Sequence, residues 1–216
     1  MGTITRSFAN NITTSGVLLP ASLTNNSIAN VTAYNASVAT GNMVLISSQT
    51  ANDSASISFT TGINSTYKEY QFWFIDIHAR VDTTNFTFNL STDSGSNYNV
   101  TKTTTFFEAR NNEAGNTPEL TYYGNHLAQS TAFQLMCWYT GNGADESLAG
   151  SMQLFNPAST TYVKHFISTV NNYVANDQSF NHFMAGYGNT TSAINAIQFK
   201  MDSGNFDGTI LMYGIK

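Results

Sequence analysis

Asp76 and His78 come closest, by residue type and spacing, to a catalytic or metal-binding pair. Residues two apart on an extended strand face the same way, so the carboxylate and the imidazole are expected side by side. Such a pair could polarise a water molecule or hold a metal ion. No third ligand follows nearby, and the other histidines of the chain are scattered. A structural, hydrogen-bonded role is therefore the favoured interpretation.

Two loops carry further acidic residues. The segment 93–97 has oxygen-bearing side chains at alternate positions, as a calcium loop does, but it lacks the distal glutamate, and a tight turn explains every residue. In the segment 141–146, Asp145 and Glu146 are adjacent, and neighbours on an extended loop point apart, which suits a glycosidase acid and base poorly. The G-x-S-x-G, H-E-x-x-H and phosphate-cradling glycine motifs are absent from the sequence. We therefore expect a protein without a catalytic site, a cofactor or a metal.

Two aromatic pairs, Tyr122-Tyr123 and Trp138-Tyr139, lie in or near irregular segments. Exposed aromatic rings beside Asn and Asp make platforms for sugars, because the ring face stacks on the sugar while polar groups fix its hydroxyls. The four residues are thus candidate glycan contacts. The alternative is that Trp138 fills the core beside Met136 and Cys137.

Composition narrows the range of functions. Charged residues make up 10% of the chain, against about 25% in an average globular protein. The net charge of −5, without a cluster of Lys or Arg, speaks against nucleic-acid binding. A lone cysteine, Cys137, excludes an intramolecular disulfide and a cysteine-based zinc site, and its apolar neighbours indicate a buried, inert thiol. No apolar run resembles a signal peptide or a membrane span, so membrane insertion is not expected.

The residues 67–79 form the densest apolar run of the sequence. Aromatic and β-branched residues dominate it without Gly or Pro, which predicts a long core strand. Strict alternation would put Trp73, Ile75, Ile77 and Ala79 on one face and Tyr70, Phe72, Phe74, Asp76 and His78 on the other. A strand that is apolar on both faces is expected in the middle of a sandwich or beneath another subunit.

From residue 42 onward, short alternating segments and turns follow one another. This rhythm predicts an all-β fold, an antiparallel β-sandwich of jelly-roll type, with a Greek-key sandwich of another strand order as the alternative. We expect the segment 98–107 to return as the hairpin partner of the strand 85–90 across the turn at 93–97. The segment 126–136 is the one place where a short helix is expected.

Residues 1–41 differ from this pattern. They carry no charge after Arg6 and hold single aliphatic residues spaced among small polar ones, too sparse to form a core of their own. We expect an extended N-terminal arm for attachment or oligomerisation, followed by the sandwich domain at 42–216, although the arm's strands could instead complete the same sandwich. The candidate contact residues of the arm are Val17, Leu18, Leu19, Leu23, Ile28 and Val31.

Several stretches resemble virion-associated proteins of marine tailed bacteriophages. They include Leu45-Ile46-Ser47-Ser48-Gln49-Thr50-Ala51, Phe59-Thr60-Thr61-Gly62-Ile63, Ile75-Asp76-Ile77-His78, Ser91 to Val100, and the closing Gly208 to Ile215. The segment Leu18 to Ser27 is similar to connectors in phage fibre-like proteins. These motifs are turns and strand ends, so the resemblance bears on fold and setting more than on biochemical role.

The resemblance implies a non-enzymatic structural protein on the surface of a phage particle, either a capsid decoration (cement) protein or a short head or tail fibre. It further implies a homo-oligomer, with a trimer favoured, that contacts other virion proteins such as capsid or tail. The alternative is a lectin-like domain that attaches the phage to a host surface glycan.

Overall fold

The computed structural model describes residues 12–13, 16–17, 42–174 and 177–216. The chain divides into two units, Met1–Thr40 and Gly41–Lys216. In the first unit, β1 (Ile12–Thr13) pairs antiparallel with β2 (Gly16–Val17). Of the candidate arm residues, Val17 belongs to β2, whereas Leu18, Leu19, Leu23, Ile28 and Val31 lie outside the described residues.

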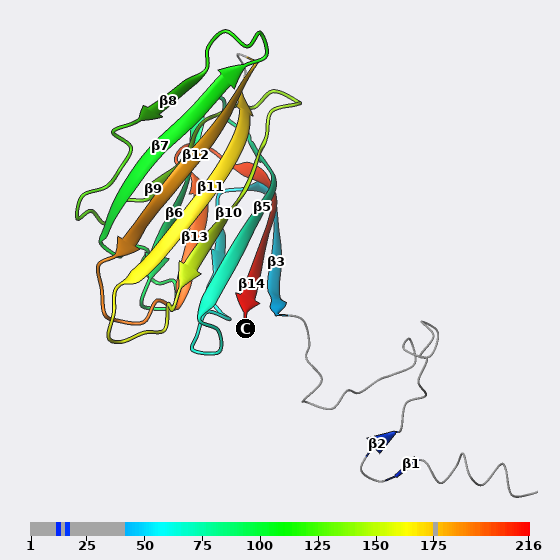
Figure 1. Cartoon of the computed structure of the whole chain (residues 1–216), viewed down its shortest axis with the longest axis vertical. Helices are drawn as coiled ribbons and strands as arrows, with labels where there is room; N and C mark the ends of the chain where they lie inside the picture. Colours follow the sequence, from blue (N-terminus) through cyan, green and yellow to red (C-terminus); the bar gives the residue numbers. More distant parts are fainter. Residues whose placement is uncertain (1–11, 14–15, 18–41, 175–176) are drawn as a thin grey trace, which may run out of the picture. The chain divides into compact units, whose positions relative to one another are not determined.

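The second unit is an all-β sandwich of two antiparallel sheets, as the sequence predicted (Figure 1). The described part of the chain contains no helix. The smaller, four-stranded sheet has the order β4 (Ile57–Phe59), β13 (Ala196–Met201), β6 (Thr84–Ser91) and β9 (Gln134–Thr140). The larger, eight-stranded sheet has the order β3 (Met43–Ser54), β14 (Phe206–Ile215), β5 (Glu69–Ala79), β10 (Leu148–Phe155), β11 (Lys164–Val174), β12 (Gln178–Gly188), β7 (Lys102–Asn112) and β8 (Glu119–Tyr122).

The strand pairing is that of a jelly roll. Counting inward from the two ends of this unit, β3 pairs with β14, β4 with β13, β5 with β10, and β6 with β9. These four pairs form one long hairpin wound around a core, and successive pairs alternate between the two sheets. Two insertions, β7–β8 and β11–β12, both join the large sheet beyond β10 and widen it.

The core strand β5 corrects the predicted division of its faces. Asp76 has a φ of +49° and lies where the pairing register with β10 and β14 shifts. This β-bulge adds one residue to the strand, so Ile77 and Ala79 return to the buried side that already holds Phe74. Trp73 and Ile75 point away from the core and are 43% and 38% exposed. Among the described residues, β5 is therefore covered on one face only.

The helix predicted for the segment 126–136 is wrong. Its backbone pairs with β7 instead: the amide of Thr104 donates to Leu127 O over 2.9 Å, and Lys102 and Ser130 exchange amide–carbonyl bonds. The next strand, β9, begins at Gln134, whose buried side chain accepts a 2.5 Å hydrogen bond from Thr104 Oγ1. Because β7 supplies external partners for these backbone groups, the segment gains nothing from helical hydrogen bonds.

The hairpin predicted between the strand 85–90 and the segment 98–107 is also wrong. The turn forms, but β6 pairs with β13 and β9, whereas β7 pairs with β12 and β8 in the other sheet. Both edges of β6 are thus occupied, and the chain crosses from one sheet to the other after the turn. Alternation and turn residues locate strands, but they do not reveal which strand is the partner.

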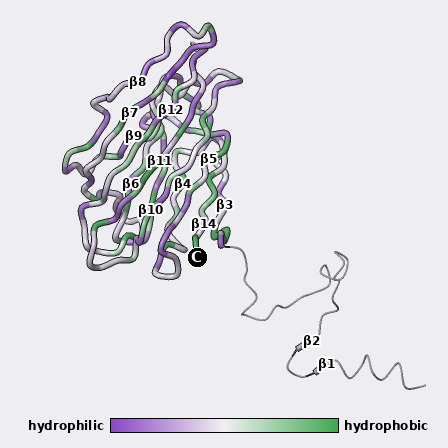
Figure 2. Tube along the Cα trace, in the orientation of Figure 1, coloured by the Kyte–Doolittle hydropathy of each residue, from purple (hydrophilic) through white to green (hydrophobic). Residues whose placement is uncertain are grey.

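Phenylalanine rings fill the space between the sheets. Phe199 of β13 lies at their centre, with five ring centroids 5.2 to 6.5 Å away. The partner rings are Phe59, Phe72, Phe74, Phe86 and Phe88. Figure 2 shows hydrophobic residues concentrated within the strands and hydrophilic ones in many of the connecting loops. This core fixes the small sheet and the large sheet relative to each other.

Candidate functional site

The structure does not assemble Asp76 and His78 into a reactive pair. The bulge at Asp76 leaves this carboxylate exposed, while His78 Nδ1 lies 2.6 Å from the carbonyl oxygen of Glu146. Next to them, Arg80 and Asp207 form an ion pair at 2.6 Å, which lowers the pKa of Asp207. Among the described residues, no three His, Cys, Asp or Glu side chains gather in an arrangement that could hold a metal ion.

The turn at 93–97 uses its acidic group internally. Asp93 Oδ1 accepts from Ser91 Oγ over 2.6 Å and from the Asn97 amide over 2.9 Å, and Oδ2 accepts from Asn97 Nδ2 over 2.7 Å. The bonds from Ser91 and Asn97 stabilise the ionised form and lower the pKa of Asp93 to about 2. This carboxylate closes its own turn instead of facing a bound cation.

The two adjacent acids of the 141–146 loop point apart. Asp145 is exposed, whereas Glu146 is buried and accepts a hydrogen bond from the Gly143 amide over 2.6 Å. A Cβ added to Gly141 would lie 2.0 Å from Glu146 Oε2, so the glycine makes room for the buried carboxylate. Glu146 therefore stabilises the loop itself and has a structural role. Cys137 is likewise buried, and burial raises the pKa of its thiol.

Three of the four candidate glycan residues come together at one end of the sandwich. The Trp138 ring lies 5.2 Å from the Tyr123 ring and 4.4 Å from the Tyr139 ring, and it stacks at 5.9 Å on the buried Phe180. Its Nε1–H donates to Glu108 Oε2, which fixes the indole orientation. We call Tyr123, Trp138 and Tyr139 the aromatic cluster. Trp138 is only half-buried, so the cluster is partly core and partly surface.

Tyr139 is the most exposed member of this cluster. It is 44% exposed and has a φ of +59°, a left-handed conformation that is uncommon for a bulky residue. Its amide donates to Asn85 Oδ1 over 3.3 Å, within the irregular pairing of β9 with β6. Tyr122 does not join the cluster, because successive residues of β8 face opposite sides of the sheet. Its ring instead lies 5.6 Å from that of His126.

Behind the aromatic cluster lies a buried ionisable pair that the sequence did not reveal. His182 Nε2 is 3.3 Å from Glu108 Oε2, and both side chains are fully buried. The rings of Phe106 and Phe180 lie 5.5 and 5.9 Å from the imidazole. Glu108 Oε2 therefore accepts from the Trp138 indole and faces the imidazole of His182, which connects the orientation of Trp138 to this buried pair.

A second buried cation, Lys102, lies at the start of β7. Its Nζ donates to Asn89 Oδ1 over 2.5 Å and to Val100 O over 2.8 Å. Both partners are uncharged, and burial lowers the pKa of Lys102 to about 7. Asn89 in turn donates to Tyr98 O and Thr131 O. Lys102 therefore ties the crossing between the sheets to the segment that follows β8.

The side of the large sheet that faces away from the small sheet is the widest surface of the domain. We call it the outer face and define it by three rows of residues that the strand register aligns. The central row crosses all eight strands. It contains Ser48, Leu211, Trp73, Ser151, Thr169, Phe183, Phe107 and Tyr122.

The flanking rows have the same character. One begins with Thr50, Thr209 and Ile75 and, past the bulge between β5 and β10, continues with Ala149, Asn171, Asn181, Ala109 and Leu120. The other contains Leu45, Tyr213, Gln71, Gln153, Ile167, Ala185 and Thr105. None of the residues in these three rows is Lys, Arg, Asp, Glu or His. The nearest ionisable residues lie just outside the flanking rows: Glu69 and Asp76 on β5, and on β11 the exposed His165, which lines a hollow of this face.

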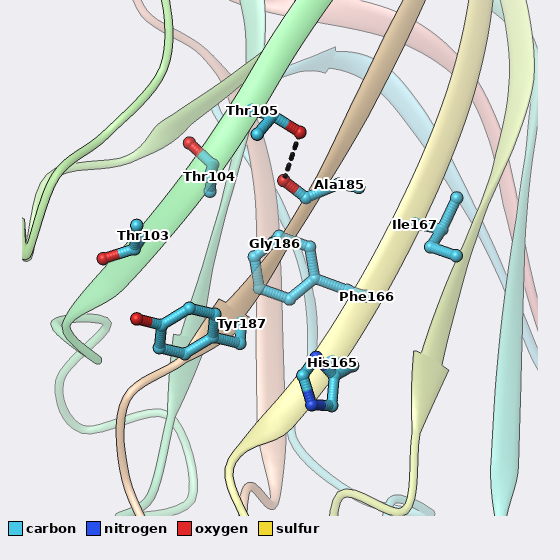
Figure 3. Close-up of a pocket in the computed structure, with 9 residues that line it drawn as sticks. All are labelled: Thr103, Thr104, Thr105, His165, Phe166, Ile167, Ala185, Gly186 and Tyr187. Atoms are coloured by element: carbon cyan, nitrogen blue, oxygen red, sulfur yellow. Dashed lines mark hydrogen bonds between the residues drawn. The ribbon is translucent and has the colours of Figure 1, made fainter.

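The outer face is uneven, with two hollows and projecting apolar side chains. An open hollow of about 460 Å³ lies over β7, β12 and β11, where Thr105 and Ala185 are small and Ile167 and Tyr187 stand at its sides (Figure 3). A second hollow of about 460 Å³ lies beside Trp73 and Ile75, over Ala149 and Ser151. Between the hollows stand large apolar side chains, among them Ile167, which is 49% exposed. Phe107 and Phe183 stack at 4.8 Å and form another ridge.

Sequence reasoning missed the outer face because its rows join residues from eight separate strands. One local signal was present: segments such as Thr103-Thr104-Thr105 and Ile167-Ser168-Thr169 carry uncharged residues at inward and outward positions alike. A solvated strand is expected to carry polar residues at its outward positions, whereas Ile167 is apolar and exposed there. Chemically, the face offers apolar contacts and neutral hydrogen-bonding groups.

No protein-family model, curated protein or solved structure matches the chain. Among the described residues, no helix is long and apolar enough to cross a membrane.

Proposed function

We propose that this chain is a non-enzymatic structural protein of a bacteriophage particle, displayed on the virion surface as a capsid decoration protein or a short head or tail fibre. The observation that carries the proposal is the outer face, a neutral surface across eight strands with exposed apolar side chains. Several large apolar side chains exposed on one uncharged sheet face favour a contact site over a solvated surface. The resemblance of the turns and strand ends to phage virion proteins gives the setting.

In this proposal, the two units of the chain have different roles. The residues 1–41 attach the protein to capsid or tail proteins, since an extended backbone can add hydrogen bonds to an exposed strand edge while aliphatic side chains fill pockets. The sandwich is the displayed part. The protein assembles as a closed homo-oligomer, the usual form of such assemblies, and the resemblance to phage fibre and decoration proteins favours a trimer.

Deletion of residues 2–41 tests this division. We expect the truncated chain to keep the far-ultraviolet circular dichroism of a β protein, because the jelly roll closes within residues 43–215. It should no longer join the phage particle when supplied in place of the full chain, which serves as the control. Particle imaging and graded dissociation of purified virions provide the measurement. A truncated chain that fails to fold, or that still joins the particle, would contradict the proposal.

A second candidate function is binding of a host surface glycan. The specific observation that favours it is Tyr139, an exposed aromatic side chain in a left-handed conformation, next to Trp138 and Tyr123. A half-exposed aromatic surface with neighbouring polar groups can stack on a sugar ring. In this case the sandwich would be a host-attachment domain.

A glycan array decides this second candidate. If it is right, the protein binds a defined glycan, and Tyr139→Asn abolishes binding while preserving the fold, because asparagine tolerates the left-handed backbone. Tyr162→Asn is the matched control, since Tyr162 is 71% exposed and lies in the turn between β10 and β11. No binding to any glycan, or equal loss in both variants, would rule out the aromatic cluster as a sugar site.

A further inference from the structure

We propose that the outer face of the eight-stranded sheet is the surface on which a second copy of this chain packs. This inference rests on the proposed function and deepens it, because it names one contact by which copies of the virion protein assemble. It is a face-to-face contact about a two-fold axis, which pairs two copies and is separate from the contacts of the trimer that the resemblance favours. Four properties of the face support it: size, charge, relief and the position of its apolar side chains.

The face is large enough for a stable contact. Eight strands lie about 4.8 Å apart, and strands of 8 to 11 residues such as β10 and β11 extend about 26 to 36 Å. The sheet therefore presents roughly 1,000 Å², above the ~800 Å² per partner that a standard protein interface buries. No neighbouring element of the described chain covers this side.

The charge pattern favours a copy of the same chain over a different partner. In a homo-oligomer, both sides of the contact come from one sequence, so any charge near the symmetry axis faces its own copy. The outer face avoids this repulsion because its three rows hold no ionisable Lys, Arg, Asp, Glu or His. A nucleic acid or a strongly charged protein would instead call for complementary charges.

The relief of the face is also self-complementary. Ile167 and Trp73, which are about half-exposed, project beside two open hollows of about 460 Å³ each. Small side chains such as Ala185 and Ser151 line the hollows. An apolar side chain of one copy can thus enter a hollow of the other, and Thr, Ser, Asn and Gln of the rows provide neutral hydrogen bonds around it. Trp73 has the residue type that most often dominates binding energy.

Sedimentation of the full chain with a charge placed in the face tests the inference. We expect the unmodified protein to be an oligomer at micromolar concentration and Ile167→Lys to weaken association at least ~30-fold, because the ammonium would be buried without a partner. Tyr162→Lys, which adds the same charge at an exposed turn away from the rows, should leave the association unchanged. A monomeric unmodified protein, or an oligomer that Ile167→Lys does not weaken, overturns the inference.

Protection of an engineered thiol gives a second readout that does not depend on a destabilising variant. Thr169 is exposed in the central row, and the native Cys137 is buried, so Thr169→Cys introduces the one accessible thiol among the described residues. In the oligomer, a thiol reagent should react slowly with Thr169→Cys, which the second copy would cover, and rapidly with Tyr162→Cys. Equally rapid reaction of both variants contradicts the inference even if Ile167→Lys fails to fold.

The outcomes also separate this inference from the proposed function. A monomer that is nevertheless found in purified virions overturns the self-association but leaves the virion role standing. An oligomer that depends on the outer face, yet is absent from virions, supports the inference and overturns the virion role.

Discussion

Phe199→Ala is expected to destabilise the sandwich by about 3–5 kcal/mol, the usual cost of removing a buried phenylalanine side chain. Phe199 is fully buried and contacts rings from both sheets, so a smaller side chain leaves a cavity that neither sheet can fill alone. The partner rings belong to β4, β5 and β6, which the chain brings together only in the folded state. The loss should therefore appear in the equilibrium stability of the whole domain.

Urea denaturation followed by circular dichroism measures this loss, with the free energy of unfolding taken from the transition midpoint and its slope. Tyr162→Ala is the matched control, because Tyr162 is 71% exposed and should change stability by no more than about 0.5 kcal/mol. A Phe199→Ala variant that is as stable as this control would mean that the core does not depend on the central ring.

Lys102 should make the free energy of unfolding increase as the pH rises above 7. Its pKa is about 7 in the folded protein, because burial disfavours the charge, whereas an unfolded lysine titrates near 10.5. Between these values the unfolded chain binds more protons, so stability rises with pH. Below pH 7 both states are protonated, and the fold bears the full cost of a buried ammonium. From pH 7 to pH 9.5 we expect a gain of about 2–3 kcal/mol.

Lys102→Met isolates this contribution. The variant cannot titrate at position 102, so the difference between its free energy of unfolding and that of the unmodified protein should grow across this range. Groups such as Cys137 and Tyr123, whose folded pKa values are raised, act in the opposite direction above about pH 8.5, and they cancel in the difference because both proteins contain them. Parallel stability curves would show that Lys102 stays charged in the fold.

The sequence predicted the strands better than their partners. The apolar run at 67–79 indicated the core strand correctly, because burial imposes aromatic and β-branched residues locally. The reversal of its faces at Asp76 could not be predicted, since a bulge depends on the register with both neighbouring strands. The hairpin at 93–97 failed for a related reason: the turn is local, but the competition of β13 and β9 for β6 is not.

The candidate site residues show the same contrast between local patterns and contacts between distant strands. Trp138 and Tyr139 are adjacent in sequence, and Tyr123 from the other predicted pair meets them in space, which no local pattern indicated. Tyr122 faces away from them because residues alternate sides along β8. This strand, Glu119–Tyr122, is too short for its alternation to be recognised in the sequence. Glu108 and His182 lie far apart in sequence and meet only because β7 and β12 pair, so no local pattern could bring them together.

The pairing of β3 with β14 sets the order in which a newly made chain can fold. Asn42 and Lys216, at the two ends of the unit, share a backbone hydrogen bond of 2.8 Å, and β14 lies between β3 and β5 in the large sheet. Until β14 has been synthesised, β3 lacks its neighbour in the large sheet and β5 has one open edge. Such long-range pairing makes folding slow. A chain that stops before β14 therefore cannot close its jelly roll, because β3 then has no partner strand.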